Sequence, residues 1–326
     1  MRAQSLVHTV CMLCMLQSCT KPPQPADSDV ISTQAGDSDN RDSGTRDDTA
    51  SDTNTPVSTE PCTQWSDPED RATVADASLD EISGLVASRA HPGVFWVHED
   101  SGAGPILTAI NGEGATHSTL TLTDVSSVDW EDMAIAPCGA VDCLWVGDFG
   151  DNGSSRSDVQ LLRVEEPDLS EVEGNVVSSA TSIPFSYPDG PQDAEALVVD
   201  AEGQPYVLTK RTDATTHIYR VPVDGTEVAT RVATVSTGDL EGLSTATTAA
   251  DLWPDGSRLL IRGYLKTIEL DISETGIDAA HLAPQAHVIT GVDLQGEAMA
   301  YDPAGPSIWH VSEGLNPTLW TIDCAE

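Results

Sequence analysis

The sequence contains little positive charge. It has 15 Lys and Arg residues against 53 Asp and Glu residues, which gives a formal net charge of -38. Nucleic acids and anionic lipid surfaces both require a basic footprint on the protein that binds them. The charge balance therefore excludes nucleic acid as an expected partner and suits an exported protein that attracts cations.

Several motifs of known chemistry are also absent. The chain has no G-x-S-x-G nucleophile elbow, no H-E-x-x-H metal motif and no P-loop. The four cysteines after residue 61 lack the C-x-x-C spacing and nearby histidines that a zinc site requires. Nothing in this region is typical of a long amphipathic helix. Function must therefore be sought in the arrangement of short β segments.

The N-terminal segment is typical of an exported bacterial lipoprotein. MRAQSLVHTVCMLCMLQSC carries Arg2, a short apolar run and then a small-residue site before Cys19. We expect residues 1–18 to be a signal peptide and Cys19 to become lipidated. The alternative is an ordinary secretory signal with incidental cysteines. Lipidation would hold the protein in the bacterial cell envelope, on the periplasmic side or the cell surface, with membrane contact through the lipid anchor only.

Residues 19–61 follow as the lipidated cysteine and a disordered acidic linker. This stretch consists mainly of Asp, Ser, Thr, Gln, Pro and Gly, and it cannot bury enough apolar surface to offset its ordering entropy. We therefore expect the folded domain to span residues 62–326.

The folded domain contains one repeated pattern. Its copies are EISGLVAS from Glu81, DWEDMAIA from Asp129, DAEALVVD from Asp193, DLEGLSTA from Asp239 and QGEAMAYD from Gln295. Each copy is followed by two further β segments, and most copies by a third, with Gly- and Pro-containing turns between them. Five such units predict an all-β, five-bladed β-propeller. A sixth, irregular blade in residues 153–187 is the alternative.

The last copy stops one strand short, so we expect a strand near DRATVADASL, from Asp70, to complete it and close the ring. A Cys62–Cys324 disulfide would tie the two ends together, and a Cys138–Cys143 disulfide would close one hairpin. Four thiols allow three pairings, and this pairing is preferred because the others would pull distant blades together. Trp96, Trp145 and Trp309 occupy comparable second-strand positions, where we expect blade packing rather than ligand stacking.

The repeats place one polar residue in register at the start of each inner strand. These five positions are Ser83, Glu131, Glu195, Glu241 and Glu297. Two carboxylates about 7 Å apart repel by roughly 2 kcal/mol at an effective dielectric constant of about 20. Calcium would offset this repulsion, because it takes six to eight oxygen ligands in flexible geometry. The alternative is that the glutamates cap hairpins by accepting backbone N–H groups.

In this arrangement the sequence resembles the five-bladed calcium-dependent nucleotidases, or apyrases. The resemblance lies in ISGL with Ser83, in WEDMA with Glu131 followed by LWVGDFG, and in the three later glutamates. It implies a central calcium ion and hydrolysis of nucleoside phosphates on the adjacent face. The pattern is also similar to phytase-like and esterase-like bacterial propellers, which do not share one reaction.

The second strand of each blade returns to the face where the glutamates begin. Its ends there place His98, Glu99 and Asp100 as candidates for a general base, and Lys210, Arg211 and Arg262 as candidates for binding an anionic group. The alternative is that these basic residues only balance nearby carboxylates. The loop GDFGDNGSS resembles a cation site in composition but lacks EF-hand spacing, and Asx turns explain it equally well.

We therefore predict a monomeric, calcium-binding envelope protein that hydrolyses small anionic phosphoesters or phosphoanhydrides. One alternative is a non-catalytic surface module that binds a protein or glycan, with a structural ion in its channel. A further alternative is a lactonase or esterase.

Overall fold

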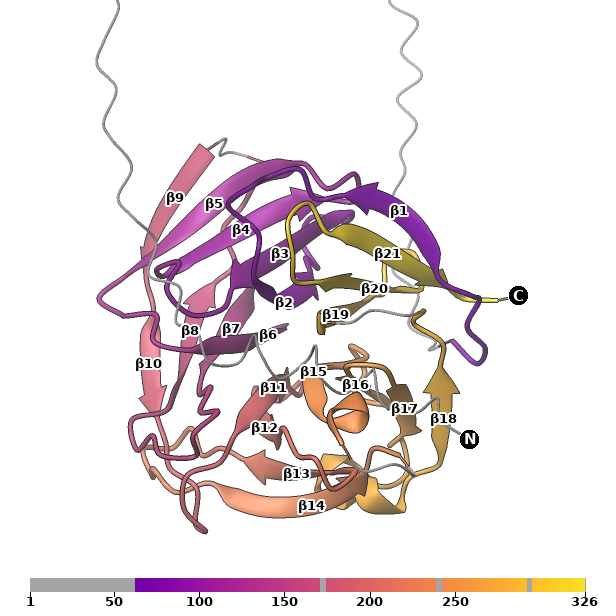
Figure 1. Ribbon diagram of the computed structural model, residues 1–326. Coiled ribbons are helices and arrows are strands. Elements are labelled where there is room, and N and C mark those ends of the chain that lie inside the picture. Colours follow the sequence, from indigo (N-terminus) through magenta and orange to yellow (C-terminus); the bar gives the residue numbers. More distant parts are fainter. Residues whose placement is uncertain (1–61, 171–173, 239–241, 292–294, 326) are drawn as a thin grey trace, which may run out of the picture. The chain divides into compact units, whose positions relative to one another are not determined.

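The computed structural model describes residues 62–325, except 171–173, 239–241 and 292–294. The predicted signal peptide, the lipidation of Cys19 and the acidic linker lie outside the described residues. Within them, the chain forms five sheets arranged as a five-bladed β-propeller, four of them four-stranded and antiparallel and one with a fifth, parallel strand (Figure 1). This confirms the predicted fold class.

The first two blades share the chain between residues 82 and 184. Blade one contains β2 (Ile82–Ala87), β3 (Val94–Glu99), β4 (Ile106–Asn111), β5 (Thr116–Thr123) and, at its outer edge, β9 (Gly174–Ser179). Blade two contains β6 (Trp130–Pro137), β7 (Asp142–Asp148), β8 (Gln160–Glu165) and β10 (Thr181–Pro184). Residues 153–187 therefore complete these two blades, β9 pairing in parallel with β5, and the described part of this stretch forms no sixth blade.

The remaining blades follow in chain order. Blade three contains β11 (Ala194–Val199), β12 (Pro205–Thr209), β13 (Thr215–Arg220) and β14 (Thr230–Ser236). Blade four contains β15 (Thr247–Leu252), β16 (Arg258–Gly263), β17 (Thr267–Asp271) and β18 (Gln285–Val288). Short 3₁₀ helices, η1 (Leu243–Thr245) and η2 (Ile277–Leu282), lie in its connections. Blade five contains β19 (Gly296–Asp302), β20 (Ser307–Ser312) and β21 (Thr318–Asp323).

The ring closes as predicted. β1 (Glu69–Thr73) pairs antiparallel with β21 and supplies the outer strand of blade five. A Cys62–Cys324 disulfide, with Cα atoms 5.6 Å apart, links the residues that flank this seam. A Cys138–Cys143 disulfide closes the β6–β7 hairpin. Both predicted pairings are confirmed, and they indicate an oxidising, extracytoplasmic environment.

The hydrophobic core is divided into five clusters, one between each pair of neighbouring blades. Trp96, Trp145 and Trp309 each lie in a different cluster and are at most 7% exposed. Burying an apolar side chain of this kind contributes roughly 1.5–3 kcal/mol. These tryptophans therefore pack the blades against one another, as the sequence predicted.

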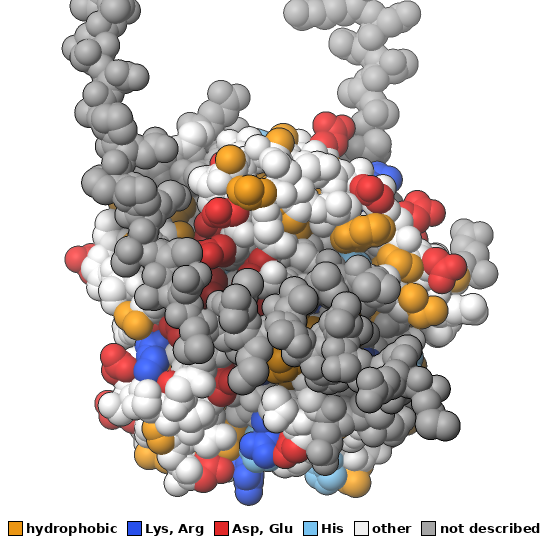
Figure 2. Space-filling view, in the orientation of Figure 1, with side chains coloured by type: hydrophobic (Ala, Val, Ile, Leu, Met, Phe, Trp, Pro, Cys, Tyr) orange, Lys and Arg blue, Asp and Glu red, His pale blue; other side chains and the backbone are white. Residues whose placement is uncertain are grey.

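Among the described residues, no helix is long and apolar enough to cross a membrane. The face drawn in Figure 2 carries Asp and Glu side chains on several blades, while Lys and Arg side chains gather at only a few places. This face thus reflects the excess of acidic residues in the sequence.

Candidate metal centre

Every inner strand carries a β-bulge near its start. In β2, for example, the register steps from Ile82 opposite Glu99 to Gly84 opposite His98, which leaves Ser83 outside the ladder. A bulge leaves its extra residue unpaired and re-aims that side chain. The bulge residues of the five blades, in order, are Ser83, Glu131 with Asp132, Glu195, Thr248 and Glu297. Four of the five ring positions predicted from the repeats, Ser83, Glu131, Glu195 and Glu297, are therefore bulge positions.

Blade four corrects the sequence alignment. Its inner strand was predicted to start at Asp239, but β15 begins at Thr247 and its bulge residue is Thr248. Glu241, the predicted ligand of this blade, lies outside the described residues. Thr248 Oγ1 donates to the carbonyl oxygen of Gly296 at 2.6 Å, and Ser83 Oγ donates to that of Glu131 at 2.5 Å. Both hydroxyl groups thus join their inner strand to the next blade.

Three carboxylates meet at the mouth of the channel between blades one and two. Asp100 follows β3, Asp129 precedes β6, and Glu131 is the bulge residue of β6. One ligand oxygen from each lies within 4.8 Å of the others. Glu131 is 4% exposed, whereas Asp100 and Asp129 are half-buried. We call these residues the acidic triad.

The triad is electrostatically strained. Burial raises the pKa of Asp100 to about 7, and the charge of Asp129 adds to the rise. Burial, followed by the charge of Glu195, raises the pKa of Glu131 well above its usual range. Burial also raises the pKa of Asp129, although Arg156 opposes that rise. An opposite charge beside these groups would favour their ionised forms.

A glycine makes this close approach possible. A Cβ atom at Gly150 would clash with Glu131 Oε1 and with the carboxyl group of Asp129. The backbone N–H of Gly150 also donates to the carbonyl oxygen of Asp129 at 3.1 Å. Gly150 therefore leaves room for the triad and helps to hold one of its members.

The loop GDFGDNGSS supports the triad from outside. Asp148 accepts hydrogen bonds from the backbone N–H of Asp129 at 3.1 Å, from Arg156 Nη2 at 3.0 Å and from Gln160 Nε2 at 3.0 Å. Asp151 accepts from the backbone N–H of Arg156 at 2.7 Å. Both loop aspartates thus have protein partners. These contacts favour a positioning role for the loop over a cation site of its own.

A different arrangement occupies the side of the mouth formed by blades three to five. Lys210 Nζ lies 2.7 Å from Glu195 Oε1, and the two side chains are 11% and 4% exposed. The same nitrogen lies 5.1 Å from the centroid of the Tyr264 ring. Burial disfavours the ammonium, but Glu195, Tyr264 and Glu297 together outweigh burial and raise the pKa of Lys210 above its ordinary value. Lys210 therefore carries a positive charge at neutral pH.

The structure places the three predicted catalytic residues in different environments. His98 is 1% exposed, its ring meets Trp130 edge-on, and burial lowers its pKa to about 4, so it is neutral at pH 7. Glu99 Oε1 accepts the backbone N–H of Glu81 at 3.0 Å. Asp100 alone of these three joins the acidic triad.

The three predicted basic residues differ in their contacts. Arg211 forms an ion pair with Asp213, within the turn between β12 and β13. Arg262 is 1% exposed and packs against Gly296, donating to the carbonyl oxygen of Ala298 at 3.4 Å. The Lys210 ammonium contacts the ring glutamate Glu195 directly. Lys210 and Arg262 thus both act on Glu297, whereas Arg211 is engaged within its own turn.

Sequence reasoning missed Asp129, Gly150 and Tyr264 as parts of the mouth. A signal for Asp129 was present, because the second and third repeats both begin with D-x-E. Gly150 and Tyr264 lie just past the second strands of their blades, a position that the repeats did not single out.

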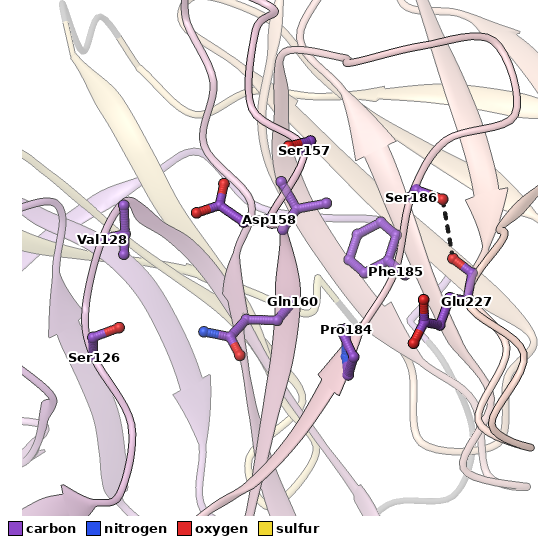
Figure 3. A pocket seen from close by; sticks show the side chains of 10 residues that line it. Ser126, Val128, Ser157, Asp158, Gln160, Pro184, Phe185, Ser186 and Glu227 are labelled. Carbon is purple, nitrogen blue, oxygen red and sulfur yellow. Dashed lines mark hydrogen bonds between the residues drawn. The ribbon is translucent and has the colours of Figure 1, made fainter.

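A separate pocket lies on the rim of blade two. It has a volume of about 380 Å³ and contains no member of the acidic triad. Figure 3 shows its Phe185 ring between the side chains of Gln160 and Glu227. The lining residues are Ser126, Val128, Ser157, Asp158, Val159, Gln160, Pro184, Phe185, Ser186 and Glu227. No Lys or Arg belongs to this set, and Gln160 connects the pocket to the triad through Asp148.

The chain is similar in fold to several solved structures. No protein-family profile matches the chain, and no curated protein sequence matches it significantly. The PQQ-bound aldose sugar dehydrogenase of Streptomyces coelicolor is similar with a TM-score of 0.49 and 13% identity, covering 81% of this chain and 99% of that chain.

Two further solved structures are similar. The Malassezia sympodialis allergen Mala s 1 has a TM-score of 0.49 and 13% identity over 78% of this chain and 96% of its own. The Myxococcus xanthus glutaminyl cyclase has a TM-score of 0.44 and 12% identity, covering 82% of this chain and 100% of that chain. At these scores none of the three informs the function of this chain.

Proposed function

We propose that this protein is a calcium-dependent hydrolase whose reaction centre is the mouth of the propeller channel. The observation that carries the proposal is the acidic triad, whose ligand oxygens lie within 4.8 Å of one another. An all-oxygen donor set suits calcium and is a poor match for zinc or copper. Burial of Glu131 and half-burial of its partners leave negative charge that a divalent cation would neutralise.

A bound divalent cation supplies Lewis acidity, which stabilises negative charge on a substrate oxygen. Proton transfer during the reaction would be carried out by side chains of the protein. Burial raises the pKa of Asp193 to about 6 and that of Glu313 to about 8. Both pKa values lie near neutrality, where a carboxyl group can take up or release a proton as a general acid or base.

The basic residues bear on the class of substrate. Lys210 is paired with Glu195, Arg211 with Asp213, and Arg262 is buried between blades. Phosphate recognition usually relies on several converging cationic donors. The contacts therefore favour an ester or lactone over the phosphoester expected from the sequence.

A non-catalytic role is the second candidate, and one observation favours it. Asp100 comes from blade one, whereas Asp129 and Glu131 come from blade two. An ion at the triad would therefore join two blades even without turnover. In that case the surface loops would bind a protein or glycan.

The proposal is tested by thermal unfolding of the full chain with calcium and with chelator at fixed ionic strength. A native-state ligand at 100 times its Kd stabilises by about 2.7 kcal/mol, so we expect a calcium-specific rise in Tm. Asp129→Asn and Glu131→Gln should abolish this rise, whereas Asp224→Asn, which changes an exposed turn, should keep it.

Panels of esters, lactones and phosphate esters then separate the candidates. Ester or lactone hydrolysis that is lost in Asp129→Asn supports the enzyme. A calcium-dependent Tm without turnover on any panel supports the binding module. No calcium effect on Tm contradicts both.

The lipid anchor at Cys19 also remains a proposal. Mass spectrometry of the mature N-terminus in a bacterial host would test it. Diacylglyceryl mass on Cys19 supports the anchor, and an unmodified mature N-terminus contradicts it.

A further inference from the structure

The mouth of the channel contains two groups of buried carboxylates, and they are neutralised differently. Among the described residues, no ion pair reaches Asp100, Asp129 or Glu131. Glu195 forms an ion pair with Lys210, and both Lys210 and Arg262 act electrostatically on Glu297. No member of the first group has a direct ion-pair partner in the described part of the chain, although Arg156 and Lys210 act on Asp129 from a distance, whereas Lys210 contacts a member of the second group directly.

We propose that the mouth has two places for a cation and that the Lys210 ammonium permanently fills one of them. This inference rests on the proposed function, because it concerns the same calcium site. It places the calcium ion off the propeller axis, against blades one and two, and it limits binding to one ion per chain. Lys210 is then a residue that sets the stoichiometry of the site, and it does not bind substrate.

The contacts of Lys210 are those of an internal counter-ion. Its nitrogen lies 2.7 Å from Glu195 Oε1 and 5.1 Å from the Tyr264 ring centroid. A cation over an aromatic face is held by the ring quadrupole. With 11% of the side chain exposed, the ammonium has little surface left for a substrate.

Glu297 provides an independent observation. It is 5% exposed, and its Oε2 atom has no hydrogen-bond partner among the described residues. A buried carboxylate oxygen without a partner is costly. Together, Glu195, Glu297 and the Tyr264 hydroxyl group would offer oxygen ligands to a hard divalent cation if the ammonium were removed.

The test is calorimetric titration of calcium into the chelator-treated full chain. The wild-type chain should bind one ion. Lys210→Met should bind two, with the first ion held on the order of 10-fold more tightly because a nearby positive charge is gone. Lys210→Arg, which keeps the charge, should still bind one ion.

Arg211→Met is the matched control. It removes one positive charge at the neighbouring position, but its ion pair with Asp213 lies away from the ring glutamates, so it should bind one ion with wild-type affinity. Lys210→Gln replaces Lys210→Met if the latter does not fold, because an amide can still donate to Glu195. The same two-ion result is expected.

The outcomes separate the two proposals. If wild type binds one ion and the folded neutral Lys210 variant also binds one with unchanged affinity, the inference is wrong and the proposed site stands. If wild type binds none but the neutral variant binds one, the acidic triad is not a calcium site and the role of Lys210 is supported. If neither binds calcium, both proposals are wrong.

Discussion

Three glycines near the channel leave room for the side chains that are buried beside them. A Cβ atom at Gly84 would clash with the His98 imidazole, and one at Gly296 would clash with the Arg262 guanidinium. A Cβ atom at Gly150 would clash with Glu131 in the acidic triad. These three glycines therefore admit two large polar side chains into blade interfaces and one cluster of carboxylates into the mouth.

Gly150→Ala tests the third of these roles. The added methyl group should push Glu131 and Asp129 apart and weaken calcium binding on the order of 10-fold, since about 1.4 kcal/mol corresponds to a factor of 10 in affinity. Calorimetric titration measures this change. Gly305→Ala is the control, because a Cβ atom there meets nothing within 4 Å. Equal affinities in the two variants would contradict the steric role.

At the scale of strands, Asp132 joins three inner strands. It shares the bulge of β6 with Glu131, and its Oδ2 atom accepts the backbone N–H groups of Leu197 in β11 at 2.8 Å and Ala250 in β15 at 3.2 Å. Its Oδ1 atom accepts the N–H of Met133 at 2.8 Å. Asp132 thus links blades two, three and four at the centre of the ring.

Asp132→Ala should lower the free energy of unfolding by on the order of 2–4 kcal/mol, because it leaves buried donors without an acceptor. Urea unfolding monitored by tryptophan fluorescence measures this. Asp255→Asn alters an exposed turn in which Asp255 accepts the N–H of Ser257 and should change stability by less than about 0.5 kcal/mol. A similar small effect for Asp132→Ala would show that other contacts hold these strands.

Most of the strands could be predicted from the sequence. Alternating β segments bounded by turns predicted the blades and the closing strand, and the positions of the cysteines at the ends of the repeats and at one hairpin predicted both disulfides. Blade four was misaligned because DLEGLSTA reproduces the repeat pattern, whereas its actual inner strand, TTAADL, has threonine at the bulge and so gives no acidic signal. Burial of His98 and Arg262 could not be predicted, because it depends on Gly84 and Gly296 in neighbouring strands.

At the scale of the whole molecule, the carboxyl groups at the mouth make the free energy of unfolding depend on pH. Burial raises the pKa of Asp100 to about 7, of Asp193 to about 6 and of Glu313 to about 8, all above their ordinary values. Each group therefore binds a proton more tightly in the folded than in the unfolded chain. Folding takes up protons between about pH 4 and 8, so rising pH disfavours the folded state across this window.

In chelator, Tm should therefore fall as the pH rises from 5 to 8, and calcium should reduce this fall because it binds the ionised carboxylates. Thermal unfolding across this range, with and without calcium, measures both effects. Glu313→Gln removes one titrating group and should flatten the curve in chelator. A Tm that rises with pH in chelator would contradict the assigned pKa shifts.

The closing strand has a consequence for how the protein is made. β1 is synthesised first, but its partner β21 contains nearly the last residues of the chain. Pairing over so long a separation is slow, and unpaired strand edges favour aggregation. Blade five cannot be completed until β21 is available, so β1 must remain unpaired until then. The Cys62–Cys324 disulfide spans the same seam and therefore holds the ring closed once the two strands have paired.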